Sequence, residues 1–375
     1  MNKLKLVTIL GTRPEIIRLS ETIKFCDTVF ENTLVHTGQN WDPNLSDIFF
    51  KDLNLRQPDH FLECPGKTLG ESLGNIIEKS YNLLSEIKPN ALLVLGDTNS
   101  ALSVISAKRL KIPIFHMEAG NRCYDENVPE EINRRIVDHT SDVNLCYTEH
   151  SRKNLLSEGL HPNFTFVTGS PMKEVLSHAL PKIDGSEVLQ NLNLQESEYF
   201  LLSAHREENI DEPQKLQNLL KAIEEISDKF GKKVVVTSHP RLRKKLEEIN
   251  YSPRDNFIFS EPFGFLDYLS LQKRAFCVLS DSGTLSEESS MLNFPAVLIR
   301  TSTERPEVLD EGSIIVGGIE PNGIYQAIIS TKERFQHSQH LVRSPDNYKS
   351  EFVSNKVASV ISSYVQIVNK KYGRT

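Results

Sequence analysis

The sequence has few of the residues that build cross-linked or metal-stapled proteins. Its five cysteines are scattered, and no two of them form a C-x-x-C pair. Disulfide frameworks use paired cysteines and zinc sites use short repeated spacings, so neither is predicted. Scattered free thiols are typical of a reducing compartment, and we expect a cytoplasmic protein.

Long hydrophobic runs and basic tracts are also missing. No apolar stretch approaches the roughly 20 residues that span a bilayer, so no membrane association is expected. The run Lys3–Leu10 is too short for a signal peptide and leads directly into Gly11–Glu15, so it predicts the first strand. The net charge is −7, and no basic tract of the kind that nucleic acid requires is present. An anionic ligand would therefore be bound by local arginines and helix N-termini.

The chain of 375 residues is longer than one compact core usually holds, which predicts two domains. Short apolar runs alternate with longer amphipathic segments, the pattern of βαβ units on a parallel sheet. We predict an α/β protein with two doubly wound, Rossmann-like domains that face a cleft. The first covers residues 1–170, the second covers 171–354, and a C-terminal helix within 355–375 crosses back to the first. Pro181–Gly185 is the best candidate for a linker.

The apolar runs and amphipathic segments place the individual elements. Strands are predicted over 5–10, 32–37, 91–95, 112–117, 143–147, 164–168, 199–203, 233–237, 257–260, 276–280, 296–300 and 314–316. Helices are predicted over 15–27, 69–87, 100–110, 130–140, 151–159 and 355–372, and between the strands of the second half. The segment 39–67 is predicted to be an elaborated loop with a short helix.

The stretch Phe115–Arg135 concentrates charged residues after a predicted strand. They are Glu118, Arg122, Glu130, Glu131, Arg134 and Arg135. Open α/β sheets bind their ligands at the carboxyl ends of the strands, so this stretch is a candidate for chemistry. A structural interpretation stays open for Pro129–Glu131, because proline and acids are favoured in the first turn of a helix. It does not account for Glu118, which stands where a buried strand should end.

Two earlier turns carry a similar ambiguity. Thr12 and Glu15 are spaced as a capping box, while Arg13 and Arg18 near the same helix N-terminus form a candidate anion site. Asp97 follows the predicted strand 91–95 and suits the N-cap of the next helix. It should also lie near Glu118, because the two residues end neighbouring strands. Clustered carboxylates repel one another, so some of them titrate near neutral pH and act as acids or bases.

The second half has four comparable strand ends. They carry His205 with Arg206, His239, the small-residue turn Ser282-Gly283-Thr284 followed by Glu288, and Arg305. Backbone N–H groups of such a small-residue turn bind phosphate at a helix N-terminus, and an acid one turn later suits a ribose diol. A helix capped in the ordinary way explains the same residues, and His239 is a secondary candidate.

Several familiar motifs are absent. The chain has no H-E-x-x-H, G-x-S-x-G or P-loop motif and no metal-ligand spacing, and its first turn is not G-x-G-x-x-G. We therefore expect no cofactor and no metal. Carboxylates on one domain, with phosphate donors and a histidine on the other, predict an enzyme that acts on a nucleotide sugar.

Seven short motifs in this order resemble the non-hydrolysing UDP-N-acetylglucosamine 2-epimerase family over nearly the full chain. They are Gly11–Glu15, Gly96-Asp97-Thr98, Glu118-Ala119-Gly120, Pro129–Glu131 with Asn133-Arg134, His205-Arg206, Asp281–Gly283 with Glu287-Glu288, and Thr303–Glu307. The resemblance implies a fold like that of the GT-B glycosyltransferases. It also implies that UDP is eliminated to give a 2-acetamidoglycal and is added back with C2 inverted.

The resemblance also assigns roles to residues. Asp97, Glu118 and Glu130 would be the acids and bases, and His205 would assist the diphosphate leaving group. The resemblance implies that Arg13, Arg134, Ser282, Gly283 and Glu288 would hold UDP. Arg18, Arg206, His239, Thr284 and Arg305 are further candidates for binding the substrate or its UDP group. The expected partners are a UDP-sugar substrate and a second copy of the chain in a homodimer.

Departures from the common family pattern point to one branch. Residues 118–123 correspond to the usual Glu-Ala-Gly-Leu-Arg-Thr, but Asn121 replaces the leucine and Cys123 replaces the threonine. The loop before Pro129 is also shorter than in the common pattern. The Gln-His-Arg stretch linked to allosteric activation is replaced at Gly38–Asp42. The chain is similar to the branch that forms UDP-N-acetyl-L-fucosamine from UDP-2-acetamido-2,6-dideoxy-L-talose for capsules and O-antigens. A GT-B glycosyltransferase and a non-catalytic nucleotide-sugar sensor remain as rival classes.

Overall fold

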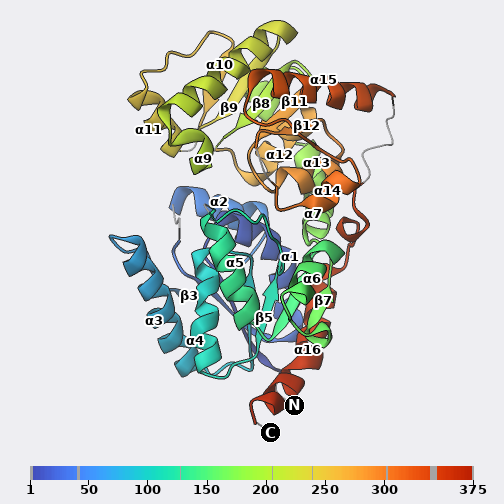
Figure 1. Ribbon diagram of the computed structural model, residues 1–375. Helices are drawn as coiled ribbons and strands as arrows, with labels where there is room; N and C mark the ends of the chain where they lie inside the picture. The colour runs from blue at the N-terminus through green and yellow to red at the C-terminus, as the bar shows by residue number, and fades with distance from the viewer. Residues whose placement is uncertain are drawn as a thin grey trace. The chain divides into compact units, whose positions relative to one another are not determined.

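The computed structural model describes residues 3–39, 43–126, 128–204, 206–238, 240–300, 303–337 and 344–373. The chain packs into two compact units. Unit 1 contains the residues up to His178 and those from Asp346 onward, and unit 2 contains Ala179–Pro345. Each unit is a parallel sheet with helices on both faces (Figure 1).

The sheet of unit 1 has the strand order β3-β2-β1-β4-β5-β6-β7. The strands are β1 (Lys5–Leu10), β2 (Glu31–His36), β3 (His60–Phe61), β4 (Ala91–Leu95), β5 (Ile114–Met117), β6 (Val143–Cys146) and β7 (Thr165–Val167). All of β4 and β5 is buried, as expected for central strands covered on both faces. The parallel register pairs Leu95 with Met117, so the carboxyl ends of β4 and β5 lie side by side.

Helices cover both faces of this sheet. They are α1 (Arg13–Val29), α2 (Pro43–Asp52), α3 (Leu69–Ile87), α4 (Val104–Arg109), α5 (Pro129–Thr140), α6 (Glu149–Ser157) and α16 (Val353–Lys371), with 3-10 turns η1 (Asn99–Ser103), η2 (Pro162–Phe164) and η3 (Asp346–Tyr348). Helix α4 packs against α3 and α5, and α16 packs against α1. The C-terminal helix therefore returns to the first unit, as predicted.

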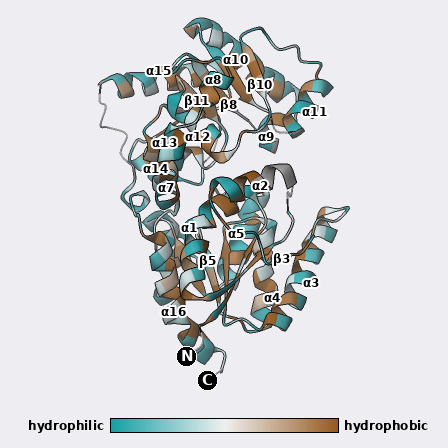
Figure 2. Ribbon diagram, turned by 180° about the vertical axis from the view of Figure 1, so that it is seen from behind, coloured by the Kyte–Doolittle hydropathy of each residue, from teal (hydrophilic) through white to brown (hydrophobic). Residues whose placement is uncertain are grey.

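Unit 2 has the strand order β10-β9-β8-β11-β12-β13. The strands are β8 (Tyr199–Ser203), β9 (Lys233–Thr237), β10 (Phe257–Ser260), β11 (Cys277–Ser280), β12 (Ala296–Leu298) and β13 (Ile315–Val316). The helices are α8 (Val188–Asn191), α9 (Glu207–Ile210), α10 (Pro213–Phe230), α11 (Pro240–Glu248), α12 (Phe265–Arg274), α13 (Leu285–Leu292), α14 (Pro306–Asp310) and α15 (Pro321–His337). Its main core joins the strands to α10, α11 and α15. In both units the strands are largely hydrophobic and the helices have polar outer sides (Figure 2).

These two doubly wound parallel sheets confirm the predicted GT-B-like fold class. The predicted linker Pro181–Gly185 is wrong, because Pro181 lies inside the continuous helix α7 (Met172–Asp184). That helix continues past the proline to Asp184, and Ile183 in this last stretch is fully buried. The unit boundaries also differ from the predicted 170 and 355, because unit 1 ends at His178 and begins again at Asp346. Asn347 thus lies in unit 1, where its carbonyl accepts from the Ser170 N–H.

Smaller differences concern single elements. The two-residue strand β3 was not predicted, since it is too short to show a period. The predicted helix 100–110 begins with the 3-10 turn η1 before α4. Among the residues that the structure describes, no helix combines the length and apolar composition needed to cross a membrane.

Candidate functional site

The turn between β1 and α1 is closed by a buried glutamate. Glu15 Oε2 accepts hydrogen bonds from the N–H groups of Gly11 (3.0 Å) and Thr12 (2.8 Å) and from the Thr12 hydroxyl (2.8 Å). This confirms the predicted capping box. Burial raises the pKa of the Glu15 carboxyl from 4.5 to about 7, although the hydrogen bonds from Thr12 and Gly11 oppose the shift. The turn that presents the half-buried Arg13 is therefore fixed from within.

Glu118 follows β5 and is held by an arginine. Its Oε2 lies 2.8 Å from Arg18 NH1, and its Oε1 accepts from Asn121 Nδ2 at 3.3 Å. Arg18 is buried, and its guanidinium carbon lies 5.7 Å from the centre of the Tyr147 ring. Arg18 thus links α1 to the end of β5 by an ion pair with little exposure to solvent.

Asp97 follows β4 and is held in a similar way. Arg134 on α5 places both Nε and NH2 2.7 Å from Asp97 Oδ2. Asn133 Nδ2 donates to the Asp97 carbonyl (2.9 Å), so α5 fixes the backbone as well as the side chain of this residue. The carboxylate keeps partial exposure, with 24% of the side-chain surface accessible.

The structure thus brings Asp97 and Glu118 to neighbouring strand ends, as predicted. A Cβ placed on Gly96, the residue before Asp97, would lie 3.7 Å from Glu118 Oε2. The observed environment differs from the predicted repulsion between clustered carboxylates, because each carboxylate forms an attractive ion pair with an arginine. The charge of each acid is therefore compensated locally before any ligand binds.

The two acids at the start of α5 have different surroundings. Glu130 is exposed, whereas Glu131 is buried. Glu131 accepts from the N–H groups of Cys123 (3.1 Å) and Tyr124 (3.3 Å) and from Arg134 NH1 (2.9 Å). Burial raises the pKa of the Glu131 carboxyl, but these donors outweigh burial and hold it below its ordinary value. Glu131 holds the loop after Gly120 and orients Arg134, and Glu130 is left facing solvent.

In unit 2, the ends of β8 and β11 are joined through Asp281. This buried carboxylate accepts from the Arg206 N–H and from Asn209 Nδ2, each at 3.0 Å. Arg206 Nε donates to the Asp281 carbonyl at 2.9 Å. Arg206 is thus anchored by its backbone and its guanidinium, with NH2 directed to Glu304 at 3.7 Å.

The predicted small-residue turn lies at the N-terminus of α13. Ser282, Gly283 and Thr284 are half-buried, and the Ser282 and Thr284 hydroxyls are 3.0 Å apart. A Cβ on Gly283 would meet Glu304 Oε1 at 2.3 Å, so a larger residue here would displace the Glu304 carboxylate or the turn. A partly open turn at a helix N-terminus has the chemistry to bind phosphate.

The remaining candidates of unit 2 are more deeply placed. Glu288 is buried and accepts from Gln272 Nε2 at 2.7 Å. Arg305 is buried, with NH2 3.3 Å from Glu287 Oε2. His205 and His239 lie outside the described residues, so their predicted roles stay predictions.

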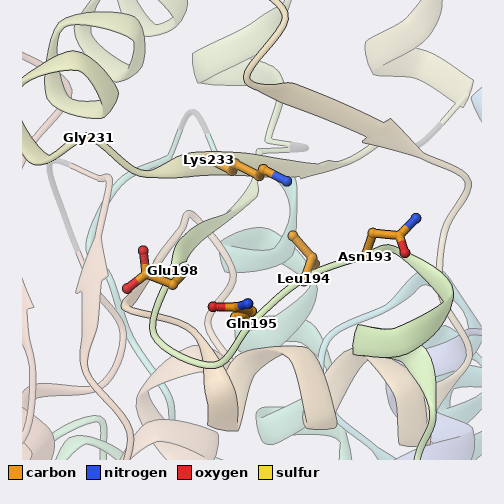
Figure 3. Close-up of a pocket in the computed structure, with 6 residues that line it drawn as sticks. All are labelled: Asn193, Leu194, Gln195, Glu198, Gly231 and Lys233. Carbon is orange, nitrogen blue, oxygen red and sulfur yellow. The ribbon is translucent and has the colours of Figure 1, made fainter.

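A surface hollow of about 280 Å³ also lies on unit 2, away from these residues. Figure 3 shows the residues around it: Asn193, Leu194, Gln195, Glu198, Gly231 and Lys233. Glu198 directly precedes β8 and Lys233 begins β9, so the hollow lies at the amino ends of the strands. Parallel sheets bind ligands at the opposite, carboxyl ends, and we assign the hollow no part in the candidate site.

Comparison with known proteins identifies the family. The family model described as UDP-N-acetylglucosamine 2-epimerase matches residues 26–362. The UDP-N-acetylglucosamine 2-epimerase of Methanocaldococcus jannaschii is 36% identical, over 87% of this chain and 91% of that protein. The chain belongs to the UDP-N-acetylglucosamine 2-epimerase family. It is accordingly an isomerase.

Two further relatives of this family bear on the substrate. A Rickettsia bellii structure of UDP-N-acetylglucosamine 2-epimerase is 43% identical, with a TM-score of 0.92 and coverage of 98% of this chain and 99% of that one. The UDP-2,3-diacetamido-2,3-dideoxy-D-glucuronate 2-epimerase of Pseudomonas aeruginosa is 33% identical, over 84% of this chain and 88% of that protein. The family therefore includes enzymes named for sugars that differ at C3 and C6.

The sequence interpretation of this epimerase missed the roles of two residues that hold the site together. They are Glu131, which supports the loop after Gly120, and Asp138, which accepts from the Gly120 N–H. Glu131, Arg134 and Asp138 are spaced three and four apart on α5, which places them on one face of the helix. The spacing is visible in the sequence, but charged residues at such spacing ordinarily lie on an exposed helix face, so the burial of this face is not predictable from it.

Proposed function

We propose that the protein inverts C2 of a UDP-sugar by eliminating UDP and adding it back. The observation that carries this proposal is the pair Asp97 and Glu118, each held by an arginine at the carboxyl ends of neighbouring strands. A structure of the M. jannaschii enzyme in complex with UDP-GlcNAc and UDP is 33% identical to this chain, with a TM-score of 0.87 and coverage of 96% of this chain and 100% of that one. That likeness supports a UDP-sugar as the substrate.

The proposed reaction needs two proton-transfer positions at C2. A carboxylate removes the C2 proton while the C1–O bond to the diphosphate breaks, which leaves a C1–C2 double bond. UDP then adds back to C1, and a carboxylic acid delivers a proton to the opposite face of C2. Asp97, Glu118 and Glu130 are our candidates for these acids and bases, and His205 is our candidate for assisting the leaving group. General acid–base groups typically contribute about 10²–10⁴-fold each.

The nucleotide is assigned to arginines and to the turn before α13. Ser282, Gly283 and Thr284 offer hydroxyl and backbone donors to a diphosphate, and Arg206 lies at the neighbouring strand end. Glu288 is assigned to the ribose diol. The other assigned residues are His239 and Arg305 on unit 2, and Arg13, Arg18 and Arg134 on unit 1.

Turnover in deuterium oxide tests the reaction. Because C2 is deprotonated and then reprotonated from groups in exchange with water, deuterium should appear at C2 of product and of recovered substrate. NMR of the sugar protons measures it. A GT-B glycosyltransferase would leave the C2 proton in place, and a sensor would return the sugar unchanged. Product with protium alone at C2 would contradict the mechanism.

We further propose that the sugar is UDP-2-acetamido-2,6-dideoxy-L-talose, converted to UDP-N-acetyl-L-fucosamine for surface polysaccharides. Asn121 replaces the leucine of the common family pattern, and its amide contacts the acid/base candidate Glu118. A 6-deoxy sugar presents a methyl where N-acetylglucosamine presents a hydroxyl. Burying that hydroxyl without a partner costs roughly 1–3 kcal/mol, or about 5- to 150-fold.

The alternative substrate is UDP-N-acetylglucosamine, converted to UDP-N-acetylmannosamine. The names of the M. jannaschii and R. bellii relatives favour it. Competition between the two UDP-sugars at equal concentration decides the matter, because the ratio of rates then gives the ratio of kcat/KM. A preference for UDP-N-acetylglucosamine would overturn the talose assignment and leave the reaction type standing.

A further inference from the structure

A buried network of charges lies behind Asp97 and Glu118. Its centre is Asp138 on α5, whose side chain has no exposed surface. Asp138 Oδ2 lies 2.7 Å from Arg122 NH1, and the Gly120 N–H contacts both carboxylate oxygens at 3.2 Å. On the other side, Oδ1 lies 3.0 Å from His116 Nδ1, without the alignment of a hydrogen bond. One carboxylate therefore joins β5, the loop after it and α5.

The histidine extends this network to the turn that carries Asp97. His116 Nε2 lies 2.9 Å from the Gly96 carbonyl oxygen, in a fully buried contact. A carbonyl only accepts hydrogen bonds, so Nε2 carries the proton and donates. Gly96 has φ +72°, a left-handed conformation suited to glycine, and it directly precedes Asp97. The position of Asp97 thus depends on the ring of His116 through a single residue.

The other branch of the network supports Glu118. This residue has φ +63°, in the left-handed region that an L residue such as glutamate adopts at an energetic cost. Gly120, with φ +84°, is fixed by its N–H to Asp138 and by Asn154 Nδ2, which donates to its carbonyl at 2.9 Å. Asp138 therefore fixes the conformation of the turn that orients the Glu118 side chain.

The charges in the network compensate one another. Arg122 is buried and donates through Nε and NH2 to both oxygens of Glu158, each at 2.7 Å, in addition to its contact with Asp138. Removing one member of a buried charge network leaves its partners uncompensated, so the network behaves as a unit. A change at Asp138 is transmitted to Gly96 and Gly120 together.

We propose that Asp138, acting with His116, is a positioning residue that sets how Asp97 and Glu118 lie relative to each other. The inference rests on the proposed function, in which those two acids transfer protons at C2. Proton transfer depends steeply on geometry, and a displacement of about 1 Å costs about 10²-fold in rate. Nucleotide binding is assigned largely to unit 2, so it should depend on Asp138 less than kcat does, even though Arg18 and Arg134 pair with the two acids. The network therefore controls kcat.

Asp142 provides a matched control, because it is a second buried carboxylate of unit 1. It accepts from Lys108 Nζ (2.6 Å), from the Ile114 N–H (3.0 Å) and from the Tyr372 hydroxyl (2.7 Å). Ile114 begins β5, so Asp142 lies at the amino end of that strand, opposite Glu118. Loss of either carboxylate should lower stability, but only loss of Asp138 should disturb the acids.

The test compares Asp138→Asn with Asp142→Asn in the full-length chain, by kcat, KM, UDP affinity and thermal unfolding. Asp138→Asn is expected to lower kcat by about 10²-fold while KM and UDP affinity change by less than about threefold. Asp142→Asn is expected to lower the unfolding temperature with kcat within about threefold of wild type. Wild-type kcat in Asp138→Asn, or an equal loss of kcat in both variants, would overturn the proposal.

Two variants at His116 cover the case in which Asp138→Asn does not fold. Glutamine at this position keeps a donor near the Nε2 position and asparagine keeps one near Nδ1. Because Nε2 holds Gly96, His116→Gln is expected to retain at least tenfold more kcat than His116→Asn. Equal kcat in the two would overturn the role of His116.

Crystal structures of the Asp138→Asn and His116→Asn variants separate this proposal from the proposed function. They report whether the Glu118 and Asp97 side chains move, even if no UDP-sugar is turned over. Inactive wild-type protein with a displaced Glu118 in Asp138→Asn would refute the function and keep the positioning role. Undisplaced acids in both variants would refute the positioning role.

Discussion

At the scale of single residues, we propose that the neighbouring acids Glu130 and Glu131 on α5 divide two tasks. Glu131 is buried and receives two backbone N–H groups and Arg134, while Glu130 beside it faces solvent. A buried acceptor of this kind contributes mainly to stability, because removing it leaves donors without partners. An exposed acid in the first turn contributes little to stability and is available for chemistry.

The first prediction separates these tasks. Glu130→Gln is expected to lower kcat by about 10²–10⁴-fold, as for loss of a proton-transfer group, with the unfolding free energy within about 0.5 kcal/mol of wild type. Glu131→Gln is expected to lower the unfolding free energy by roughly 1–3 kcal/mol. Steady-state kinetics and urea titration of both variants measure the two effects. A fully active Glu130→Gln enzyme would remove Glu130 from the mechanism.

The second prediction concerns Glu15, whose pKa burial raises from 4.5 to about 7. A raised carboxyl pKa means that the folded state binds the proton more tightly. The contribution of Glu15 to stability is therefore fully present below pH 4.5 and is lost as pH rises through about 7. Glutamine stays neutral and keeps an acceptor oxygen for Gly11 and Thr12. The free energy of unfolding of Glu15→Gln, relative to that of wild type, should therefore rise by on the order of 3 kcal/mol between pH 5 and pH 8.

Urea unfolding of both proteins at several pH values in that window checks the Glu15 prediction. His36 is a control within each protein, because burial lowers its pKa to about 4 and its contribution is lost as pH falls from 6.5 through 4. That term is common to both proteins and cancels in their difference. If the unfolding free energies of the two proteins keep a constant difference from pH 5 to pH 8, Glu15 does not titrate in this range.

At the scale of elements, the sequence predicts strands well and buried polar contacts poorly. Strands β1, β4, β8, β9 and β10 have the predicted bounds, because each is a short and largely apolar run. The linker was misplaced because a proline inside a packed helix has the same sequence signal as a break. The turns at strand ends are predicted only from their positions directly after the predicted strands in the sequence. Which acid is buried, as with Glu15 and Asp138, depends on tertiary neighbours that no local pattern encodes.

The third prediction belongs to the turn before α13. Gly283→Ala places a Cβ 2.3 Å from Glu304 Oε1, and Glu304 is held by Arg300 at 2.9 Å. The turn or Glu304 must move, so we expect UDP affinity to fall by at least about tenfold, or about 1.4 kcal/mol. Isothermal titration with UDP measures the change. Gly74→Ala in α3 is the control, because its Cβ meets no atom within 4 Å and should stabilise the helix by roughly 0.5–1 kcal/mol without changing UDP affinity. Unchanged affinity in Gly283→Ala would remove this turn from the nucleotide site.

At the scale of the whole molecule, the chain leaves unit 1 through α7 and returns to it for α16. Both ends of the chain therefore belong to unit 1, while unit 2 has a hydrophobic core of its own. Helix α16 contributes Val357, Ile361, Val365 and Val368 to buried positions, and it packs against α1. Each unit should then respond separately to a loss of its own core contacts.

The last prediction uses two matched isoleucines to test this separation. Ile361 on α16 is buried in unit 1 and Ile328 on α15 is buried in unit 2. Truncation of a buried isoleucine to alanine costs roughly 2–5 kcal/mol, through lost transfer free energy and the cavity left behind. Ile361→Ala should therefore speed amide hydrogen exchange in β1, β4 and α1 and leave β8, β9 and β11 protected. Ile328→Ala should produce the reverse pattern, because exchange from core strands reports the stability of the unit that contains them. If either variant speeds exchange equally in both sets of strands, the two units unfold as one cooperative body, and the division of the molecule at α7 has no thermodynamic meaning.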